Sequence, residues 1–203
     1  MSDTLLLATR NAHKLQEIRD LLIGTGMEIV SLGDVGVVAH AAEEDLEIFD
    51  TFEGNALAKA RYYRRLTGLA TVADDSGLCV DALGGAPGIH SRRFAPEQFR
   101  AGRAEDAANN AWLLHELTAV PAERRGARYR CALALLDAGR TLVVNGSVFG
   151  RIAQQERGEN GFGYDPLFVP TGEERSFGEL SPDIKAARSH RAVAVRRLRP
   201  WLS

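Results

Sequence analysis

Short apolar runs that alternate with segments of helical periodicity constrain the fold of this 203-residue chain most strongly. The first run, Thr4 to Thr9, precedes a helical segment that Gly24 is well placed to end. The apolar residues of that segment recur at helical spacing: Leu15, Ile18, Leu21 and Leu22. A second helical segment ends at Gly68, and a strand over Ala70 to Ala73 follows it. Strands that alternate with helices in this way indicate an α/β fold.

The remaining elements add an antiparallel pair to this pattern. Asp50-Thr51-Phe52-Glu53 has the spacing of a capping box and opens the second helix. Strands over Arg128 to Leu136 and Thr141 to Phe149 flank a short polar turn, which predicts a hairpin. Other predicted elements are a loop at Gly84 to Gly88, a helix around Asp106 to Leu117, a strand near Leu167 to Val169 and a helix that starts at Ser181-Pro182. We therefore predict a single α/β domain over residues 1–203, with a mixed sheet flanked by helices.

Composition excludes several classes of protein. Hydrophobic residues make up 45% of the chain and charged residues 26%, which is typical of a globular protein and not of a disordered or fibrous one. The formal net charge of −2 provides no basic field for binding a nucleic-acid polymer. No stretch is long and apolar enough to span a bilayer, and no signal-peptide pattern is present. Cys79 and Cys131 form no metal-binding or disulfide pattern, so we expect reduced core residues in a cytoplasmic protein.

Polar and cationic residues gather where the first strand passes into the first helix. This junction comprises Thr9, Arg10, Asn11, Ala12, His13 and Lys14. Free backbone N–H groups and the helix dipole favour an anion at a helix N-terminus, so the junction is interpreted as a phosphate-binding segment. It lacks the glycines of a dinucleotide fingerprint and of a P-loop, and an ordinary polar N-cap loop is the alternative.

Two adjacent carboxylates, Asp74 and Asp75, follow the apolar strand that begins at Ala70. Successive side chains of a strand point to opposite faces, so one carboxylate is expected to serve a site while the other ties down a turn. The carboxylate that serves the site is suited to bind a hard cation or to accept a proton from attacking water. Glu47, in an acidic segment upstream, is a candidate second ligand of the same Mg²⁺. The alternative for Asp74 and Asp75 is an Asp-rich turn, and the alternative for Glu47 is a solvated acidic face.

A glycine-rich loop carries two aromatic residues and a carboxylate in the sequence Gly161-Phe162-Gly163-Tyr164-Asp165-Pro166. Glycines let a loop approach a ligand closely, and an aromatic ring stacks on a nucleotide base. Asp165 or nearby backbone groups are candidates to bind the edge of that base. Lys185 and Ser189-His190-Arg191 add cations near a helix start. The alternatives are an aromatic-anchored turn and a plain basic helix end.

Taken in this order, these segments resemble the inosine triphosphate pyrophosphatase family over nearly the whole chain. The N-terminal motifs are Thr9-x-Asn11-x-x-Lys14 and Thr51-Phe52-x-x-Asn55-Ala56. The central motif is Ala73-Asp74-Asp75-Ser76-Gly77-Leu78-x-Val80-Asp81-Ala82-Leu83-x-Gly85-x-Pro87-Gly88-x-x-Ser91. The C-terminal motifs are Gly161-Phe162-Gly163-Tyr164-Asp165-Pro166-x-Phe168, and Lys185 with Ser189-His190-Arg191. Each motif alone is weak, but their order is highly specific.

The resemblance implies two lobes around a long twisted sheet, a nucleotide cleft between the lobes, and a homodimer. It implies that Asp75 is the general base and a Mg²⁺ ligand and that Glu47 is a second metal ligand. The family often has Thr-Gly shortly after this Glu, whereas Ile48-Phe49-Asp50 follow Glu47 here, so Glu44 and Asp45 are fallback candidates. Asp74 shares the metal or supports the turn. The implied polyphosphate-binding residues are Thr9, Asn11, Lys14 and Ser76. This chain has Arg10 where the family commonly has a small residue or Lys, and Arg10 is a candidate for an added phosphate contact. The residues implied around the base and nearby phosphates are Phe162, Gly163, Tyr164, Asp165, Lys185, His190 and Arg191.

The implied reaction converts inosine- and xanthosine-type triphosphates (ITP, dITP and XTP) into the monophosphate and pyrophosphate. Mg²⁺ bridges phosphate oxygens, Asp75 activates a water for attack on the α-phosphorus, and Lys14 offsets charge on the leaving group. A hydrogen-bond donor opposite the purine 6-oxo group excludes the 6-amino group of adenine. Two alternatives stay open: a pyrophosphatase with a different modified-base preference, and a nucleotide-binding regulator without turnover.

Overall fold

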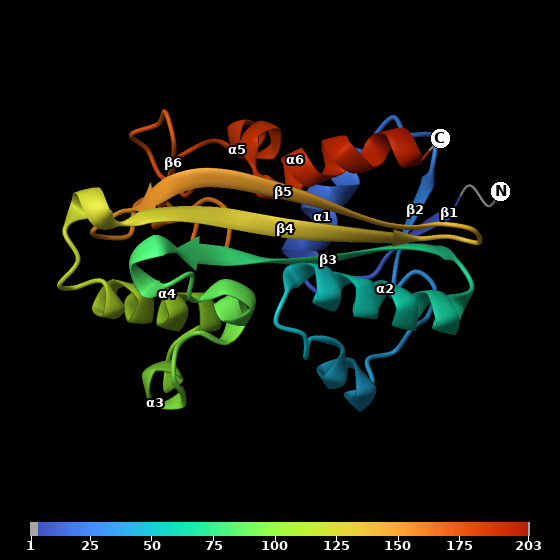
Figure 1. Ribbon diagram of the computed structural model, residues 1–203, viewed down its shortest axis with the longest axis horizontal. Helices are drawn as coiled ribbons and strands as arrows, with labels where there is room; N and C mark the ends of the chain where they lie inside the picture. Colours follow the sequence, from blue (N-terminus) through green and yellow to red (C-terminus); the bar gives the residue numbers. More distant parts are fainter. Residues whose placement is uncertain (1–3, 203) are drawn as a thin grey trace. The chain divides into compact units, whose positions relative to one another are not determined.

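The computed structural model describes residues 4–202, apart from the side chains of residues 42 and 44, and confirms the predicted mixed α/β class (Figure 1). Its six-stranded sheet has the order β2-β1-β3-β4-β5-β6. The strands are β1 (Thr4–Leu7), β2 (Glu28–Ser31), β3 (Ala70–Val80), β4 (Gly126–Leu136), β5 (Thr141–Ile152) and β6 (Phe168–Pro170). Strand β1 pairs in parallel with β2 and β3, whereas β5 and β6 are antiparallel. The sheet is therefore mixed, as predicted.

The described residues also form six α-helices. They are α1 (Ala12–Leu22), α2 (Phe52–Thr67), α3 (Glu97–Arg100), α4 (Glu105–Glu116), α5 (Pro182–Arg188) and α6 (His190–Leu198). Of these, α5 and α6 follow the last strand. Short 3-10 helices cover Ala41–Leu46, Asp81–Leu83, Gly88–Arg93, Ala122–Arg124 and Arg199–Trp201. Among residues 4–202, no helix has both the length and the apolar character needed to cross a membrane.

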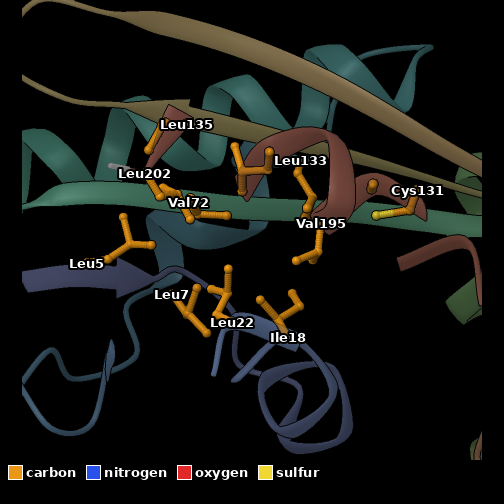
Figure 2. Packing of buried hydrophobic residues seen from close by; sticks show 12 residues of the cluster. Leu5, Leu7, Ile18, Leu22, Val72, Cys131, Leu133, Leu135, Val195 and Leu202 are labelled. Atoms are coloured by element: carbon orange, nitrogen blue, oxygen red, sulfur yellow. The ribbon is translucent and has the colours of Figure 1, made fainter. Parts of the chain in front are cut away.

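The chain divides into two compact units, and strands β3, β4 and β5 contribute residues to both. The first unit takes its described residues from Met1–Asp75, Cys131–Gly146 and Arg191–Ser203. Its core joins β1, β3 and β4 to helices α1 and α6 (Figure 2). The core residues labelled there are Leu5, Leu7, Ile18, Leu22, Val72, Cys131, Leu133, Leu135, Val195 and Leu202. Within this unit, α2 lies on the opposite side of the strands from α1 and α6 (Figure 1).

The second unit comprises Ser76–Arg130 and Ser147–His190 and has a core of its own. Aromatic rings occupy its centre, where Phe168 lies with its ring centroid 4.7 Å from that of Tyr129 and 5.4 Å from that of Phe177. Cys79 belongs to this unit and Cys131 to the first; both are buried and free, which confirms the prediction of reduced core cysteines.

The second helix begins one residue later than the capping-box pattern predicts. Thr51 has an extended backbone conformation, and its Oγ1 accepts a hydrogen bond from the Gly54 N–H at 3.1 Å. Thr51 is therefore the N-cap, and the prediction that placed the box at Asp50 to Glu53 is wrong by one position. The C-terminal prediction is confirmed, because Gly68 follows the helix in the left-handed conformation with φ 73°.

This assignment predicts unequal effects of two neighbouring substitutions. Thr51→Ala removes an N-cap acceptor and is expected to lower the free energy of unfolding by about 1 kcal/mol. Asp50→Ala is the matched control and is expected to change it by less than about 0.5 kcal/mol. Urea denaturation of both variants measures the difference. An equal or larger loss for Asp50→Ala would return the cap to Asp50.

Candidate active site

Strand β3 carries both central carboxylates inside its length and not at its end. The sequence Asp74-Asp75-Ser76-Gly77 was predicted as a turn, but β3 runs without a break from Ala70 to Val80. Leu78 and Val80 are fully buried in the core of the second unit, and this burial holds the chain extended beyond the polar residues. The turn prediction is therefore wrong, whereas the predicted division of the two carboxylates between opposite faces is confirmed by their different contacts.

Gly77 is explained by close packing. A Cβ atom at this position would overlap the Gly88 carbonyl oxygen and the Ser91 Oγ. The Ser91 hydroxyl accepts a hydrogen bond from the Leu78 N–H at 2.9 Å and donates one to the Gly88 carbonyl at 2.6 Å. The glycine in the central motif thus lets the segment from Gly88 to Ser91 lie directly against β3.

Asp74 is buried beside cationic side chains of the first unit. Its side chain is fully buried; Lys14 Nζ lies 2.6 Å from Oδ1, and Arg191 Nε lies 3.6 Å from Oδ2. The Cys131 thiol donates a hydrogen bond to Oδ2 at 3.1 Å. Burial alone would raise the pKa of Asp74, but Lys14, Arg191 and Lys59 together hold it well below its usual range. Asp74 is therefore ionised at neutral pH, and it holds Lys14 and Arg191, which were predicted to bind phosphate and to lie near the base, respectively.

Arg191 lies at this anion. It is 2% exposed, and its Nη1 lies 2.6 Å from Glu17 Oε2 on α1. Burial lowers the pKa of the Arg191 guanidinium, but Asp74 and Glu17 outweigh that effect and raise it. The structure thus places Arg191 with Lys14 and Asp74 in the first unit, and Glu17 is a partner that the sequence analysis did not identify.

Asp75 faces a different set of groups. Asn55 Nδ2 donates to its Oδ2 at 3.1 Å, and Lys59 Nζ lies 3.3 Å from its Oδ1. Burial raises the pKa of the Asp75 carboxyl; Lys59 and Lys14 lower it, while Glu47 and Asp74 raise it further, and the outcome is a raised pKa. Neighbouring carboxylates whose pKa values move in opposite directions are typical of sites where one acts as a base and the other stays charged.

Lys59 links the two predicted metal ligands and was missed by the sequence analysis. Its Nζ lies 2.7 Å from Glu47 Oε1 as well as near Asp75. The sequence feature that could have identified Lys59 is its spacing. Lys59 follows Asn55 by one helical turn, on the side of α2 that faces the protein interior. Asn55 also accepts a hydrogen bond from the Phe49 N–H at 2.9 Å, so it holds the segment after Glu47 beside Asp75.

The donor set fits a hard divalent cation held partly by substrate. Among the described residues, no group of three or more His, Cys, Asp and Glu side chains is arranged to hold a metal ion. Asp75 and Glu47 nevertheless meet at one ammonium group, so a single positive charge already lies between them. Mg²⁺ is commonly held by one or two carboxylates plus substrate phosphates and water. Asp45 is exposed, and the Glu44 side chain lies outside the described residues.

The predicted phosphate-binding segment forms the N-cap of α1. Asn11 Oδ1 accepts from the Lys14 N–H at 3.0 Å, and Thr9 Oγ1 accepts from the Asn11 N–H at 3.2 Å. Ala12 and His13 are exposed in the first turn of the helix. Arg10 is turned toward the acidic segment, with its Nη2 2.7 Å from Glu43 Oε1. The phosphate-binding interpretation and the N-cap alternative are therefore compatible in this segment.

In the second unit, Asp165 organises the loop that was predicted to bind the base. It is 3% exposed; its Oδ2 accepts from the Phe162 N–H at 2.9 Å and from Lys185 Nζ at 2.6 Å, and its Oδ1 accepts from the Tyr129 hydroxyl at 3.3 Å. These contacts indicate that Asp165 anchors the loop. His190 is buried and stacks on Tyr129, with ring centroids 4.8 Å apart.

The two aromatic residues of this loop differ in their surroundings. Tyr164 is buried, and its hydroxyl donates to the Ser91 carbonyl at 2.7 Å. Phe162 is half-buried, and Lys185 Nζ lies 4.5 Å from the centroid of its ring. Gly163 and Ser76 are also half-buried. Phe162 is therefore the aromatic ring of this loop that is better placed to stack on a ligand.

Comparison with known proteins identifies the family of this chain. Residues 5–201 match the model of the Ham1 family. The chain belongs to the Ham1 family. It is 49% identical over 202 residues to a dITP/XTP pyrophosphatase from Mycobacterium bovis, with 98% of this chain and 94% of that protein covered. The predicted family is thereby confirmed.

Solved structures of Ham1-family proteins share the fold. A HAM1 protein from Coxiella burnetii has a TM-score of 0.84 at 36% identity, with 98% of both chains covered. A nucleoside-triphosphatase / dITP/XTP pyrophosphatase from Mycobacterium abscessus has a TM-score of 0.72 at 47% identity, with 96% of this chain and 98% of that chain covered. These similarities confirm the mixed α/β fold.

The cation cluster around Asp74 predicts a pH dependence of stability. The pKa of Asp74 is lower in the folded protein than its ordinary value of 3.8, so its stabilisation is complete above that value and is lost as the pH falls below it. Asp74→Asn leaves Lys14 without its paired carboxylate and Arg191 with Glu17 alone, and is expected to cost roughly 3–5 kcal/mol at pH 7. Below about pH 4 that difference should shrink.

Urea denaturation between about pH 2 and pH 7 measures both effects. The exposed Asp45→Asn serves as the matched control and should follow the wild type throughout. A cost of Asp74→Asn that is constant across this range would show that Asp74 is not a depressed carboxyl.

Proposed function

We propose that this Ham1-family chain hydrolyses the non-standard purine nucleoside triphosphates ITP, dITP and XTP to the monophosphate and pyrophosphate. One observation carries the proposal: Asp74 and Asp75 are adjacent on β3, yet Asp74 is paired with cations from α1 and α6, whereas Asp75 lies beside an amide and a lysine of α2. A single strand thereby supplies both a fixed anion and a basic carboxylate. The dITP/XTP pyrophosphatase activity named for the Mycobacterium bovis relative is in keeping with this arrangement.

Asp75 is the general base in this proposal. Its raised pKa increases its affinity for a proton, and the Asn55 amide fixes the orientation of its carboxylate. Asp75 takes a proton from the water that attacks the α-phosphorus. Glu47 and Asp75 are the residues that would hold Mg²⁺, which supplies charge neutralisation of phosphate oxygens when bound.

The polyphosphate is held by the N-terminus of α1 and the cations beside it. Asn11 and Thr9 order the first turn, whose backbone N–H groups and dipole favour an anion. Lys14 carries the charge that offsets the pyrophosphate leaving group, and Asp74 sets its position. Ser76 follows directly in β3, and Arg10 and His13 are exposed near the same helix end.

The base is held by the loop of the second unit. Phe162 stacks on the purine, with Lys185 behind the ring, and His190 packs on Tyr129. Asp165 positions the loop and does not bind the base itself, because its two oxygens already accept hydrogen bonds from Phe162, Lys185 and Tyr129. A donor opposite the 6-oxo group distinguishes these purines from adenine. The homodimer, the cytoplasmic location, the exclusion of nucleic-acid polymers and membranes, and the identity of the metal as Mg²⁺ belong to the same proposal and rest on sequence.

Pyrophosphate release from five triphosphates with Mg²⁺ tests the proposal: those of inosine, xanthosine, guanosine, adenosine and thymidine. We expect strong turnover of the first two alone. Asp75→Asn should lower kcat by about 10²–10⁴-fold, since it removes the general base. Asp20→Asn, which changes an exposed carboxylate of α1 that has no role in the proposed site, should leave kcat unchanged.

Equal turnover of all five nucleotides would contradict the base preference and favour a pyrophosphatase of broader specificity. Full activity of Asp75→Asn would show that another residue is the general base. Mg²⁺-dependent binding of ITP without release of pyrophosphate would favour a regulator.

A further inference from the structure

Helix α4 holds Gly163 by both of its backbone groups. Asp106 Oδ2 accepts a hydrogen bond from the Gly163 N–H at 2.7 Å, and Asn110 Nδ2 donates one to the Gly163 carbonyl at 3.2 Å. Asp106 and Asn110 are four residues apart and so lie on one face of the helix. All three residues belong to the second unit.

These two bonds restrain a glycine of the base loop. Gly163 has φ +63°, and a side chain placed on it would meet no atom within 4 Å, so its conformation and not close packing explains the glycine. Its N–H belongs to the peptide that joins it to Phe162, and its carbonyl belongs to the peptide that joins it to Tyr164. Holding both groups therefore fixes both peptide planes around a residue that otherwise has wide conformational freedom.

The same bonds act on Phe162. The Phe162 N–H is held by Asp165 at 2.9 Å, and the peptide that follows Phe162 is held by Asp106 at 2.7 Å. The backbone is thus restrained on both sides of the half-buried ring. Since the Phe162 and Gly163 N–H groups are both donated to carboxylates within the loop or helix, neither serves the purine edge in this arrangement.

Asn110 brings into the fold a buried acceptor without a donor among the described residues. It is 2% exposed, and within the described part of the chain its Oδ1 has no hydrogen-bond donor. A buried acceptor without a donor destabilises the folded state, and an apolar side chain of similar size avoids that loss. The amide donates to Gly163 and to Glu156 Oε2 at 3.3 Å. The contact to Gly163 gives this costly side chain a functional explanation.

We infer that Asp106 and Asn110 are positioning residues that fix Phe162 for stacking and thereby set the affinity and selectivity for the purine base. The inference rests on the proposed function, in which this loop binds the base. The two side chains act through Gly163 and not through contact with the reacting phosphorus. Their removal should therefore affect KM and base preference more than kcat.

Asp106→Ala tests the inference directly. Asp106 is exposed, so the variant is expected to fold. Loss of one charge-assisted hydrogen bond should raise KM for ITP about tenfold, change kcat by less than about threefold, and lower the ITP-over-ATP ratio of kcat/KM. Asp106→Asn keeps an acceptor oxygen and should recover most of the loss. Glu105→Ala removes a neighbouring carboxylate of α4 that pairs with Arg92, and should behave as wild type.

Asn110→Leu provides a second test with an opposite effect on stability. It removes the unsatisfied acceptor together with the donor to Gly163, so the melting temperature should stay constant or rise while KM for ITP rises. Backbone hydrogen exchange in residues 158–166 should accelerate in both Asp106→Ala and Asn110→Leu. A purely structural role would instead lower the melting temperature and leave the KM-to-kcat split unchanged.

Calorimetric binding of ITP in an Asp75→Asn background separates this inference from the proposed function. A wild type without turnover contradicts the proposed function, whereas the binding experiment still measures the effect of Asp106. About tenfold weaker binding by the Asp106→Ala, Asp75→Asn double variant supports the inference. Unchanged binding and an unchanged ITP-over-ATP ratio overturn it, even if the wild type is fully active.

Discussion

The alternation of side chains along β3 is the constraint on which the rest of the site depends. Because consecutive residues of a strand face opposite sides, Asp74 and Asp75 enter different surroundings although one peptide bond joins them. Asp74 meets Lys14, Arg191 and the Cys131 thiol. Asp75 meets Asn55 and Lys59. The strand thus gives one carboxylate a depressed pKa and the other a raised pKa without separating them in the chain.

The elements around β3 in the first unit follow from this arrangement. A fully buried carboxylate is stable only with partners of opposite charge, and these come from α1 through Lys14 and from α6 through Arg191. Both helices also contribute apolar residues to the core in Figure 2, so the packing that closes the core also delivers the cations. On the other face, α2 brings Asn55 and Lys59 on neighbouring turns. Charge compensation and hydrophobic packing therefore use the same elements.

Much of the fold could be predicted from local sequence, because the apolar residues of helices and strands recur every few positions. The segment interpreted as phosphate-binding lies at the N-terminus of α1, as its position in the sequence predicted, and the opposite directions of Asp74 and Asp75 were predicted from strand geometry alone. The Asp-Asp-Ser-Gly segment was mistaken for a turn because its composition favours turns, whereas burial of Leu78 and Val80 keeps it in the strand.

The partners of the site residues were less predictable, since they join residues far apart in the sequence. Glu17 with Arg191 and Tyr129 with Asp165 are such pairs. Lys59 left a detectable signal, namely a lysine on the inward side of α2, but its two carboxylate partners emerge only from the folded chain. The start of α2 was predicted one residue too early for a local reason, because Asp50 and Thr51 are both good N-caps.

The most direct measurement of this account is the titration of the two carboxyl groups in the metal-free protein. Carboxyl ¹³C chemical shifts of the aspartates, assigned with Asp74→Asn and Asp75→Asn, follow each group separately against pH. The account predicts that Asp75 titrates above the ordinary aspartate pKa of 3.8 and that Asp74 stays ionised to well below it. Titration of both groups together near that value, or of Asp74 above Asp75, would contradict the division of roles along β3.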